Sequence, residues 1–348
     1  MRILLFLLGF SAATSADAQR IGPWTEAVVS VRDLPGATRL LREVGGWRVT
    51  AEGKVARSEL DYWRLPPHIT ARFLRVCAPA ATSGCIRFVR FNGAAQRPVR
   101  LAARPWDTGG IFSLMVRTND VQSLFRRAIS LGWWAESEPI AFTFGESKLQ
   151  NVVLTGPHGI NIAAYERVSP PFTAFPVGLI SQTFNSMRMV RDQRASLGFY
   201  RDKLGFQIVF DSDYRDPTPQ PSNFSLPQNL TTSVVRRAAA LQPAPGEVGR
   251  VEVMQFVGLS GKDVAAHAHP PNLGLLSVRY PVIGLAAYRR RLADHQVPLI
   301  YSAAALKVEG LGKVEAIAVR DPDGAITEFY ETGRHAEPTP RAAHRTRR

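Results

Sequence analysis

An internal repeat constrains the fold of this chain more than any other feature of its sequence. Val31-Arg32-Asp33 recurs as Val190-Arg191-Asp192, and at the same offset Gly46-Trp47 recurs as Gly205-Phe206. The match between the two segments needs no gap, which indicates that one structural unit has been duplicated.

Each copy has the pattern of a strand, a helix and a second strand. In the first copy residues 27–31 are apolar and mostly β-branched, and residues 37–44 have helical spacing. Two glycines follow this helix, and a glycine can end a helix in a left-handed turn. In the second copy the spacing predicts a helix over 194–204, ended by Gly205.

A second repeated element closes each half of the chain. Gly156-Pro157-His158-Gly159 matches Asp321-Pro322-Asp323-Gly324, and both lead into a strand that ends in Tyr-Glu. The strands and helices predicted upstream are 112–117 with 121–131, and 275–279 with 285–295. The chain therefore contains four similar units, at 24–100, 108–167, 180–258 and 272–332.

The order of these units predicts how the chain divides into domains. A length of 348 residues suits two domains. We expect one domain over 19–168 and the other over 180–333, with 169–179 as a proline-rich linker. The proline-rich stretch 211–228 interrupts the third unit and is either a lid or a surface loop.

The two ends of the chain differ in composition from the rest. Arg2, the apolar residues 3–10 and the small residues around Ala18 have the pattern of a secretory signal peptide. We therefore expect residues 1–18 to be removed and the protein to be periplasmic or secreted. Residues 334–348 hold five Arg and one Glu, which predicts a disordered basic tail.

The net charge and the two cysteines bear on partners and compartment. A net charge of +14 can attract nucleic acid, but no basic helix with interleaved aromatic residues is present, so we expect no nucleic-acid partner. No stretch after the first apolar run is long enough to predict a membrane span. Cys77 and Cys85 flank a turn-like segment between strand-like residues 71–76 and 86–91, so a disulfide would suit an oxidising compartment, although spacing alone does not decide it.

The third and fourth units carry a family resemblance. Residues 185–192, followed by Phe199-Tyr200 and Leu204-Gly205-Phe206, resemble the opening of a vicinal oxygen chelate module. Residues 321–324 and Glu328 resemble its closing segment. The chain is thus similar to glyoxalases, bleomycin-resistance proteins, fosfomycin-modifying enzymes and extradiol dioxygenases. The resemblance implies an α+β fold, in which four βαβββ modules pair into two domains and each domain curls a mixed sheet into a cup.

The resemblance also places the family's metal-ligand positions in the first half of the chain. They fall on Glu26, Arg87, Ile111 and Ala163. Because an Arg and two apolar side chains do not bind a cation, we expect the first cup to hold no metal and to be structural or an apolar pocket.

In the second half the same positions fall on Asn185, Glu252, Leu273 and Glu328. Three oxygen ligands from separate strands would suit Mg²⁺ or Mn²⁺ better than Zn²⁺ or Fe²⁺, which prefer imidazole. Leu273 stands where metal-binding relatives have His, which disfavours an extradiol dioxygenase. His267 and His269, just before the last unit, are candidate replacements for the missing ligand.

Each of these candidates also has a structural interpretation. Glu252 faces outward if the strand register is shifted by one residue, and Asn185 can bond to neighbouring backbone. Glu328 can be an ordinary carboxylate of the closing segment. Arg188, on the wall of the second cup, is a candidate to bind an anionic substrate or else makes a solvated edge contact.

Two functions are compatible with these residues. The first is an exported lyase or isomerase that binds a small organic molecule, with a divalent metal chelating two neighbouring oxygens while Glu328 or Glu252 moves a proton. The second is a metal-free protein that binds or sequesters a small molecule, as bleomycin-resistance proteins do. The resemblance favours the enzyme, while the substrate and the oligomeric state are not determined by the sequence.

Overall fold

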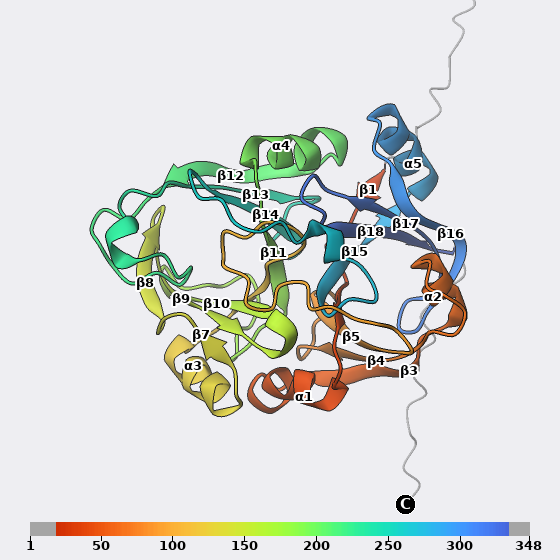
Figure 1. Ribbon diagram of the computed structural model, residues 1–348, viewed down its shortest axis with the longest axis horizontal. Helices are drawn as coiled ribbons and strands as arrows, with labels where there is room; N and C mark the ends of the chain where they lie inside the picture. Colours follow the sequence, from red (N-terminus) through yellow and green to blue (C-terminus); the bar gives the residue numbers. More distant parts are fainter. Residues whose placement is uncertain (1–18, 334–348) are drawn as a thin grey trace, which may run out of the picture.

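The computed structural model describes residues 19–333, so the predicted signal peptide and basic tail lie outside the described residues (Figure 1). One of its two sheets is built from the first and last units. Its strands are β1 (Arg20–Ile21), β2 (Glu26–Ser30), β3 (Arg48–Lys54), β4 (Thr70–Cys77), β5 (Cys85–Asn92), β15 (Gly274–Ile283), β16 (Leu299–Val308), β17 (Gly312–Arg320) and β18 (Ile326–Thr332). They are ordered β16-β17-β18-β15-β2-β5-β4-β3, with β1 paired to β15, and we call this the first sheet.

The second sheet is built from the second and third units. Its strands are β6 (Ser113–Arg117), β7 (Trp134–Ala135), β8 (Ile140–Phe144), β9 (Ser147–Thr155), β10 (Asn161–Ser169), β11 (Thr183–Met189), β12 (Gln207–Tyr214), β13 (Arg236–Gln242) and β14 (Arg250–Phe256). They are ordered β12-β13-β14-β11-β6-β10-β9-β7, with β8 paired to β9. Each sheet is mixed, because a parallel pair within each unit flanks an antiparallel pair between units. The α+β fold of paired βαβββ units is thus confirmed.

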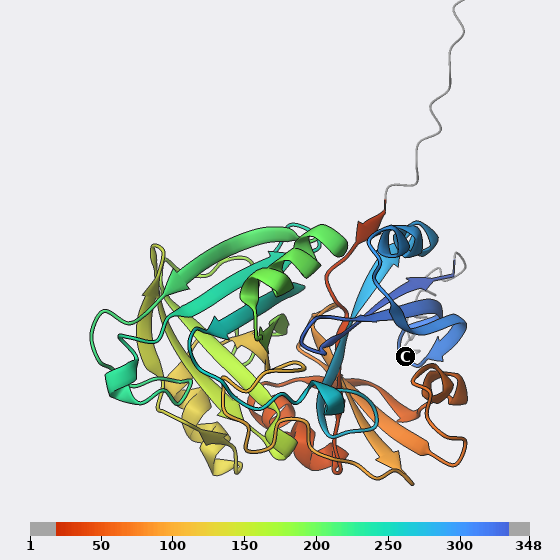
Figure 2. The same cartoon turned by 45° about the horizontal axis from the view of Figure 1, so that its top comes forward.

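The pairing of the units differs from the expected one. The domains predicted over 19–168 and 180–333 require unit 1 to pair with unit 2 and unit 3 with unit 4. Instead β2 pairs with β15 and β6 pairs with β11, so units 1 and 4 share one sheet and units 2 and 3 the other. Figure 2 shows this as red and orange strands lying beside blue ones, and yellow strands beside green and teal ones. The prediction was wrong because the first strands of all four units have the same apolar pattern, which does not specify their partners.

Residues 19–333 form five α-helices, which are α1 (Leu34–Arg39), α2 (Arg57–Tyr62), α3 (Val121–Ser130), α4 (Gln193–Gly198) and α5 (Leu285–Asp294). All except α2 lie where the repeat predicts a helix. In both copies of the first repeat the helix continues into a π turn, η1 (Leu40–Val44) and η3 (Phe199–Lys203). Gly46 and Gly205 follow these turns with φ of 66° and 81°, the left-handed conformation that glycine adopts at low cost. Helix α2 has no counterpart in the repeat and is not predicted by it.

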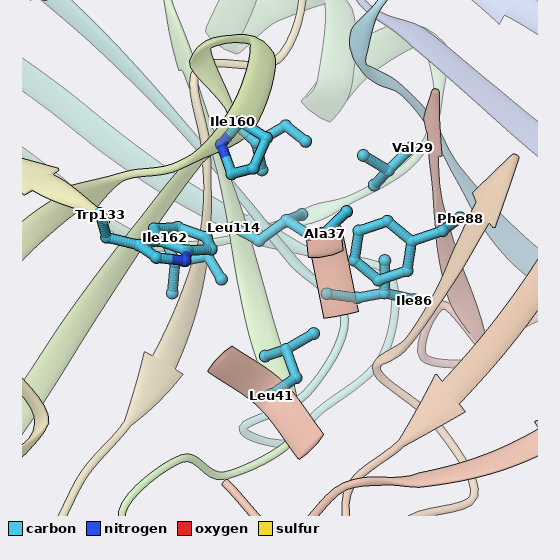
Figure 3. A pocket seen from close by; sticks show the side chains of 10 residues that line it. Val29, Ala37, Leu41, Ile86, Phe88, Leu114, Trp133, Ile160 and Ile162 are labelled. Carbon is cyan, nitrogen blue, oxygen red and sulfur yellow. The ribbon is translucent and has the colours of Figure 1, made fainter. Parts of the chain in front are cut away.

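The outer faces of the two sheets and the helices pack into one shared core. Figure 3 shows apolar side chains of unit 1, among them Val29 and Phe88, facing Leu114, Ile160 and Ile162 of unit 2. The cavity between them is about 10 Å³, which is no larger than the space for one water molecule. Back-to-back packing therefore joins units 1 and 2, while strand pairing joins each of them to a unit in the other half of the chain.

A disulfide joins the neighbouring strands β4 and β5. Cys77 and Cys85 lie at the ends of these strands with their Cα atoms 4.4 Å apart. Separately, no helix within residues 19–333 is long and apolar enough to cross a membrane.

Candidate functional site

The concave face of the first sheet is organised around the side chain of Arg279 on β15. Its three guanidinium nitrogens donate to three buried carboxylates from different elements. These are Glu328 on β18 at 3.1 Å, Glu26 on β2 at 3.0 Å and Glu59 on α2 at 2.8 Å. The other oxygens of the carboxylates are also bonded, since Glu26 accepts from Arg75 and Glu59 accepts from Arg87.

The charges in this cluster stabilise one another. Burial alone would raise the pKa of Glu26, but the guanidinium groups of Arg279, Arg87 and Arg75 outweigh burial and hold the pKa below its usual value. Burial would likewise lower the pKa of Arg279, and the three carboxylates instead raise it well above its usual value. Glu26 and Arg279 are therefore both charged at neutral pH.

We call the concave face of the first sheet, formed by units 1 and 4, the first cup, and its residues do not fit a divalent cation. The guanidinium of Arg279 already supplies the positive charge between the carboxylates of Glu26, Glu59 and Glu328, and each carboxylate is bonded to it. A metal ion would have to displace or repel this guanidinium. Glu26 and Arg87, which stand at two of the family's metal-ligand positions, are both held within this ion-pair cluster.

The concave face of the second sheet, formed by units 2 and 3, is what we now call the second cup, and it contains a cavity of about 540 Å³. Most of its wall is aromatic or aliphatic, and the aromatic residues are Phe142, Phe144, Tyr165, Phe184, Phe210, Tyr214 and Phe224. The small side chains Ala238 and Ala240 on β13 leave the space open. A volume of this size accommodates a small organic molecule.

Glu252 faces this cavity from β14. Its Oε2 accepts a hydrogen bond of 3.1 Å from Nδ2 of Asn185 on β11. Burial raises the pKa of the Glu252 carboxyl to about 7, against the smaller lowering effects of Asn185 and Arg250. The carboxyl can therefore take up or release a proton near neutral pH.

Two tyrosines lie close to this carboxyl. Burial raises the pKa of Tyr165 well above its usual value, and Glu252 raises it further. Burial also raises the pKa of Tyr214, to which Glu252 again contributes. Both phenols keep their protons at neutral pH and can donate a hydrogen bond to an oxygen of a bound molecule.

The residues of the second cup do not fit a hard divalent cation either. At the strand position paired with Asn185 stands Met115 on β6, and Met115 is paired in turn with Ala163 on β10. Asn185 is also committed, because its Oδ1 accepts from the Ser186 amide while its Nδ2 donates to Glu252. One carboxylate beside a thioether and a methyl group is a poor ligand set for Mg²⁺ or Mn²⁺.

The predicted metal ligands are not brought together. Asn185 and Glu252 lie in the second cup, whereas Glu328 is bonded to Ser277 and Arg279 in the first. Within residues 19–333 no three His, Cys, Asp or Glu side chains are close enough to hold a metal ion together. The prediction of a site made by Asn185, Glu252 and Glu328 was wrong, because it assumed that units 3 and 4 share a cup. For the same reason Glu328 cannot act with Glu252 on one substrate.

Three other candidates lie away from the cavity. Arg188 is fully buried on the opposite face of β11 from Asn185, where it donates to the backbone and hydroxyl oxygens of Ser186. The two-residue period of a strand explains this, since residues 185 and 188 have opposite parity. His267 and His269 precede β15 and do not line the cavity, and Nδ1 of His269 lies 2.7 Å from the Pro270 carbonyl oxygen. The prediction that Arg188 binds substrate from the cup wall was therefore wrong.

The proline-rich stretch after β12 lies over the cavity. Its residues Asp216, Asn223 and Phe224 are among those that line it. Nδ2 of Asn223 donates a buried hydrogen bond of 2.8 Å to Oδ1 of Asn151 on β9. Of the two interpretations of this stretch, a cover over the cup fits these contacts, and an isolated surface loop does not.

Several cavity residues were not identified from the sequence, chiefly a set of arginines. They are Arg117, Arg167, Arg215, Arg236 and Arg250. The signal that could have found Arg250 is its position two residues before Glu252, since both then face the same side of β14. Glu59 had no such signal, because it lies on a helix that the repeat does not contain.

Comparison with solved structures supports the same fold. Glyoxalase I from Zea mays aligns with a TM-score of 0.59 and 13% identity, over 90% of this chain and 92% of that one. A dioxygenase candidate from Bacillus subtilis aligns with a TM-score of 0.54 and 12% identity, over 90% of this chain and 86% of that one. Neither a family model nor a curated protein sequence matches the chain. The resemblance to vicinal oxygen chelate proteins is thus confirmed for the fold. Sequence identities of 12–13% do not extend it to activity or ligand.

Proposed function

We propose that the second cup binds a small organic molecule and that the Glu252 carboxyl transfers a proton to or from it. The observation that supports this most is the position of Glu252, a carboxyl of pKa about 7 facing an aromatic-walled cavity of about 540 Å³. A general base is most effective when its pKa lies near the working pH. No step is assigned to a metal, because the ligand sets of both cups do not fit one.

The proposed step is the removal of a proton from a carbon next to a carbonyl group. The Glu252 carboxylate accepts the proton, and the electron pair of the C–H bond moves to the carbonyl oxygen as an enolate. Tyr165 and Tyr214 can donate hydrogen bonds to that oxygen as its charge develops. Return of the proton to a neighbouring atom completes an isomerisation, and loss of a leaving group from the adjacent carbon completes an elimination.

We further propose that the protein acts outside the cytoplasm, as the N-terminal sequence pattern suggests. The disulfide between Cys77 and Cys85 supports this location, because such bonds persist in oxidising compartments. Fractionation of cells that produce the full-length chain would test it, and recovery of an uncleaved chain in the cytosol would contradict it.

Deuterium exchange tests the proton transfer directly. We suggest 2-hydroxyacetophenone in D₂O as the probe, because it carries a C–H bond next to a carbonyl and two neighbouring oxygens. Proton NMR should show faster exchange with the wild-type protein and only the background rate with Glu252→Gln. Glu138→Gln, the same chemical change at an exposed loop position, should behave as wild type.

A second candidate function is sequestration of an organic molecule without catalysis. The aromatic wall favours it, including the edge-to-face pair of Phe144 and Phe210 with ring centroids 5.0 Å apart. This candidate predicts that 2-hydroxyacetophenone gives a saturation-transfer NMR signal with the protein while its exchange stays at the background rate. It also predicts that Glu252→Gln binds the probe as tightly as the wild-type protein does.

A further inference from the structure

One end of the cavity carries an excess of positive charge from one buried and two partly buried arginines. Arg117 ends β6, Arg167 lies on β10 and Arg250 begins β14, and all three line the cavity. Arg117 and Arg250 share one acidic neighbour, Glu247, which lies 3.0 Å from Nη2 of Arg117 and 3.2 Å from Nη2 of Arg250. We call Arg117, Arg167, Arg250 and Glu247 the basic cluster.

The basic cluster is not electrically balanced by the protein. Within residues 19–333 Arg167 forms no ion pair with an acid, and the buried Nε atoms of Arg117 and Arg167 have no hydrogen-bond partner. Arg117 itself is only 8% exposed. Burial lowers the pKa of Arg117, and Arg167 and Arg250 lower it further, against Glu247, which raises it. Burying like charges with unpaired N–H groups is costly unless an anion joins them.

Aromatic rings hold two of the three arginines in place. The guanidinium carbon of Arg117 lies 4.4 Å from the ring centroid of Phe184 and 4.6 Å from that of Phe172. Arg167 lies over the same Phe172 ring at 5.8 Å. Stacking of this kind holds a guanidinium plane while its N–H edge is left for an oxygen ligand.

The basic cluster lies close to Glu252, the proposed proton-transfer group, and its Arg250 is on the same strand. Arg250 precedes Glu252 by two residues on β14, so both side chains face the cavity. Two residues of a strand span about 7 Å, which is the length of a small molecule with an acidic group at one end.

We propose that the second cup prefers small aromatic organic acids, whose carboxylate or phosphate group binds to Arg117, Arg167 and Arg250 while a carbon next to a carbonyl group, further along the molecule, lies over Glu252. This inference rests on the proposed function of the cup and adds the chemical class of its ligand. Bonds from the charged groups favour the anion, and the aromatic wall accepts the ring.

A matched pair of fluorescent dyes tests the specificity. The probes are 1-anilinonaphthalene-8-sulfonate, which is an anion, and N-phenyl-1-naphthylamine, its neutral analogue. We expect Arg167→Gln and Arg250→Gln to weaken binding of the anionic dye roughly tenfold to a hundredfold, the loss typical of one charge-assisted hydrogen bond. Binding of the neutral dye should change less than about twofold, a shift well below the energy of one hydrogen bond. Arg90→Gln on the exposed face of the first sheet is the matched control and should leave both dyes unaffected.

Competition with the anionic dye distinguishes a carboxylate from a phosphate as the preferred acidic group. Benzoate and phenyl phosphate should each displace the anionic dye from the wild-type protein, and their relative affinity identifies the preferred acid, whereas the neutral benzamide should not. Thermal unfolding checks that each variant is folded. Because Arg167 is partly exposed, replacing it should disturb the fold little, so Arg167→Gln is a suitable test variant.

The outcomes separate this inference from the proposed function. If both dyes bind but the arginine variants weaken them equally or not at all, the anion specificity is refuted while the cavity remains a binding site. If benzamide competes as well as benzoate, the specificity is refuted in the same way. If neither dye binds the folded wild-type protein, the binding function and the inference fail together.

Discussion

Replacing Glu252 by Gln should stabilise the protein at alkaline pH and not at acid pH. Burial raises the pKa of this carboxyl from 4.5 to about 7, so the folded protein holds a proton there that the unfolded chain releases. Stability contributed by this group is therefore fully present below pH 4.5, is lost as the pH rises towards 7, and does not recover above it. Glutamine resembles the protonated acid, keeps an oxygen that can accept from Asn185, and escapes this loss.

The expected size of the effect follows from the shift. Each unit of pKa corresponds to about 1.4 kcal/mol, so the full shift would amount to about 3 kcal/mol of unfolding free energy. Because the side chain reaches the cavity, we expect about 2–3 kcal/mol at pH 8 after partial solvation. For a chain of this length that is roughly 3–5 °C in the unfolding temperature.

Calorimetry or circular dichroism at pH 4.5 and pH 8 measures this difference. The Glu252→Gln variant and the wild type should unfold at nearly the same temperature at pH 4.5, and the variant at the higher temperature at pH 8. The exposed Glu138→Gln variant should show no such divergence. Parallel behaviour of Glu252→Gln and wild type across the pH range would refute the argument that burial raises this pKa, and with it the assignment of Glu252 as the proton-transfer group.

Two further predictions concern the first sheet. Arg279→Met should lower the unfolding free energy by about 3–5 kcal/mol in urea denaturation, because three buried carboxylates lose their common partner; the more exposed Arg289→Met should cost far less, and equal losses would contradict the role of burial. The double variant Cys77→Ser and Cys85→Ser should lose about 2–3 kcal/mol, the chain-entropy value for a loop this short. An unchanged urea midpoint on reduction of the wild type would contradict that second value.

The sequence predicted the units of this fold well and their pairing poorly. The repeated helices end at Gly46 and Gly205 as expected, because a left-handed residue after an apolar helix is a local requirement. Pairing is a long-range property, and the apolar pattern of β2 does not distinguish β6 from β15 as its partner. Because the first strands of all four units share one apolar pattern, the sequence of these strands did not predict which units pair.

The sequence predicted site residues correctly only where the alternation of side chains along a single strand determines which face they occupy. Glu252 and Asn185 both line the cavity, as the resemblance implied for their positions, but they hydrogen-bond to each other instead of holding a metal. The prediction for Glu328 was wrong because unit 4 pairs with unit 1, which places this residue in the first sheet. The prediction for Arg188 was wrong because its side chain lies on the face of β11 opposite to that of Asn185. Glu59 was out of reach, since an inserted helix delivers its carboxylate across the sheet.

The two cups show how one scaffold can yield a filled core and an open cavity. Strand β4 in unit 1 and β13 in unit 3 hold the same place beside the last strand of their units. On β4 the large side chain of Phe73 packs among the buried apolar residues of the first cup, together with Trp63, which follows α2. On β13 the corresponding face carries Ala238 and Ala240, and the cavity lies above them. Arg279 completes the contrast, because its guanidinium ties the carboxylates of the first cup together while Glu252 in the second has no cation of its own within bonding distance among the described residues. The difference in side-chain volume and the difference in charge pairing point the same way: the first cup stabilises the protein, and the second is available to a ligand.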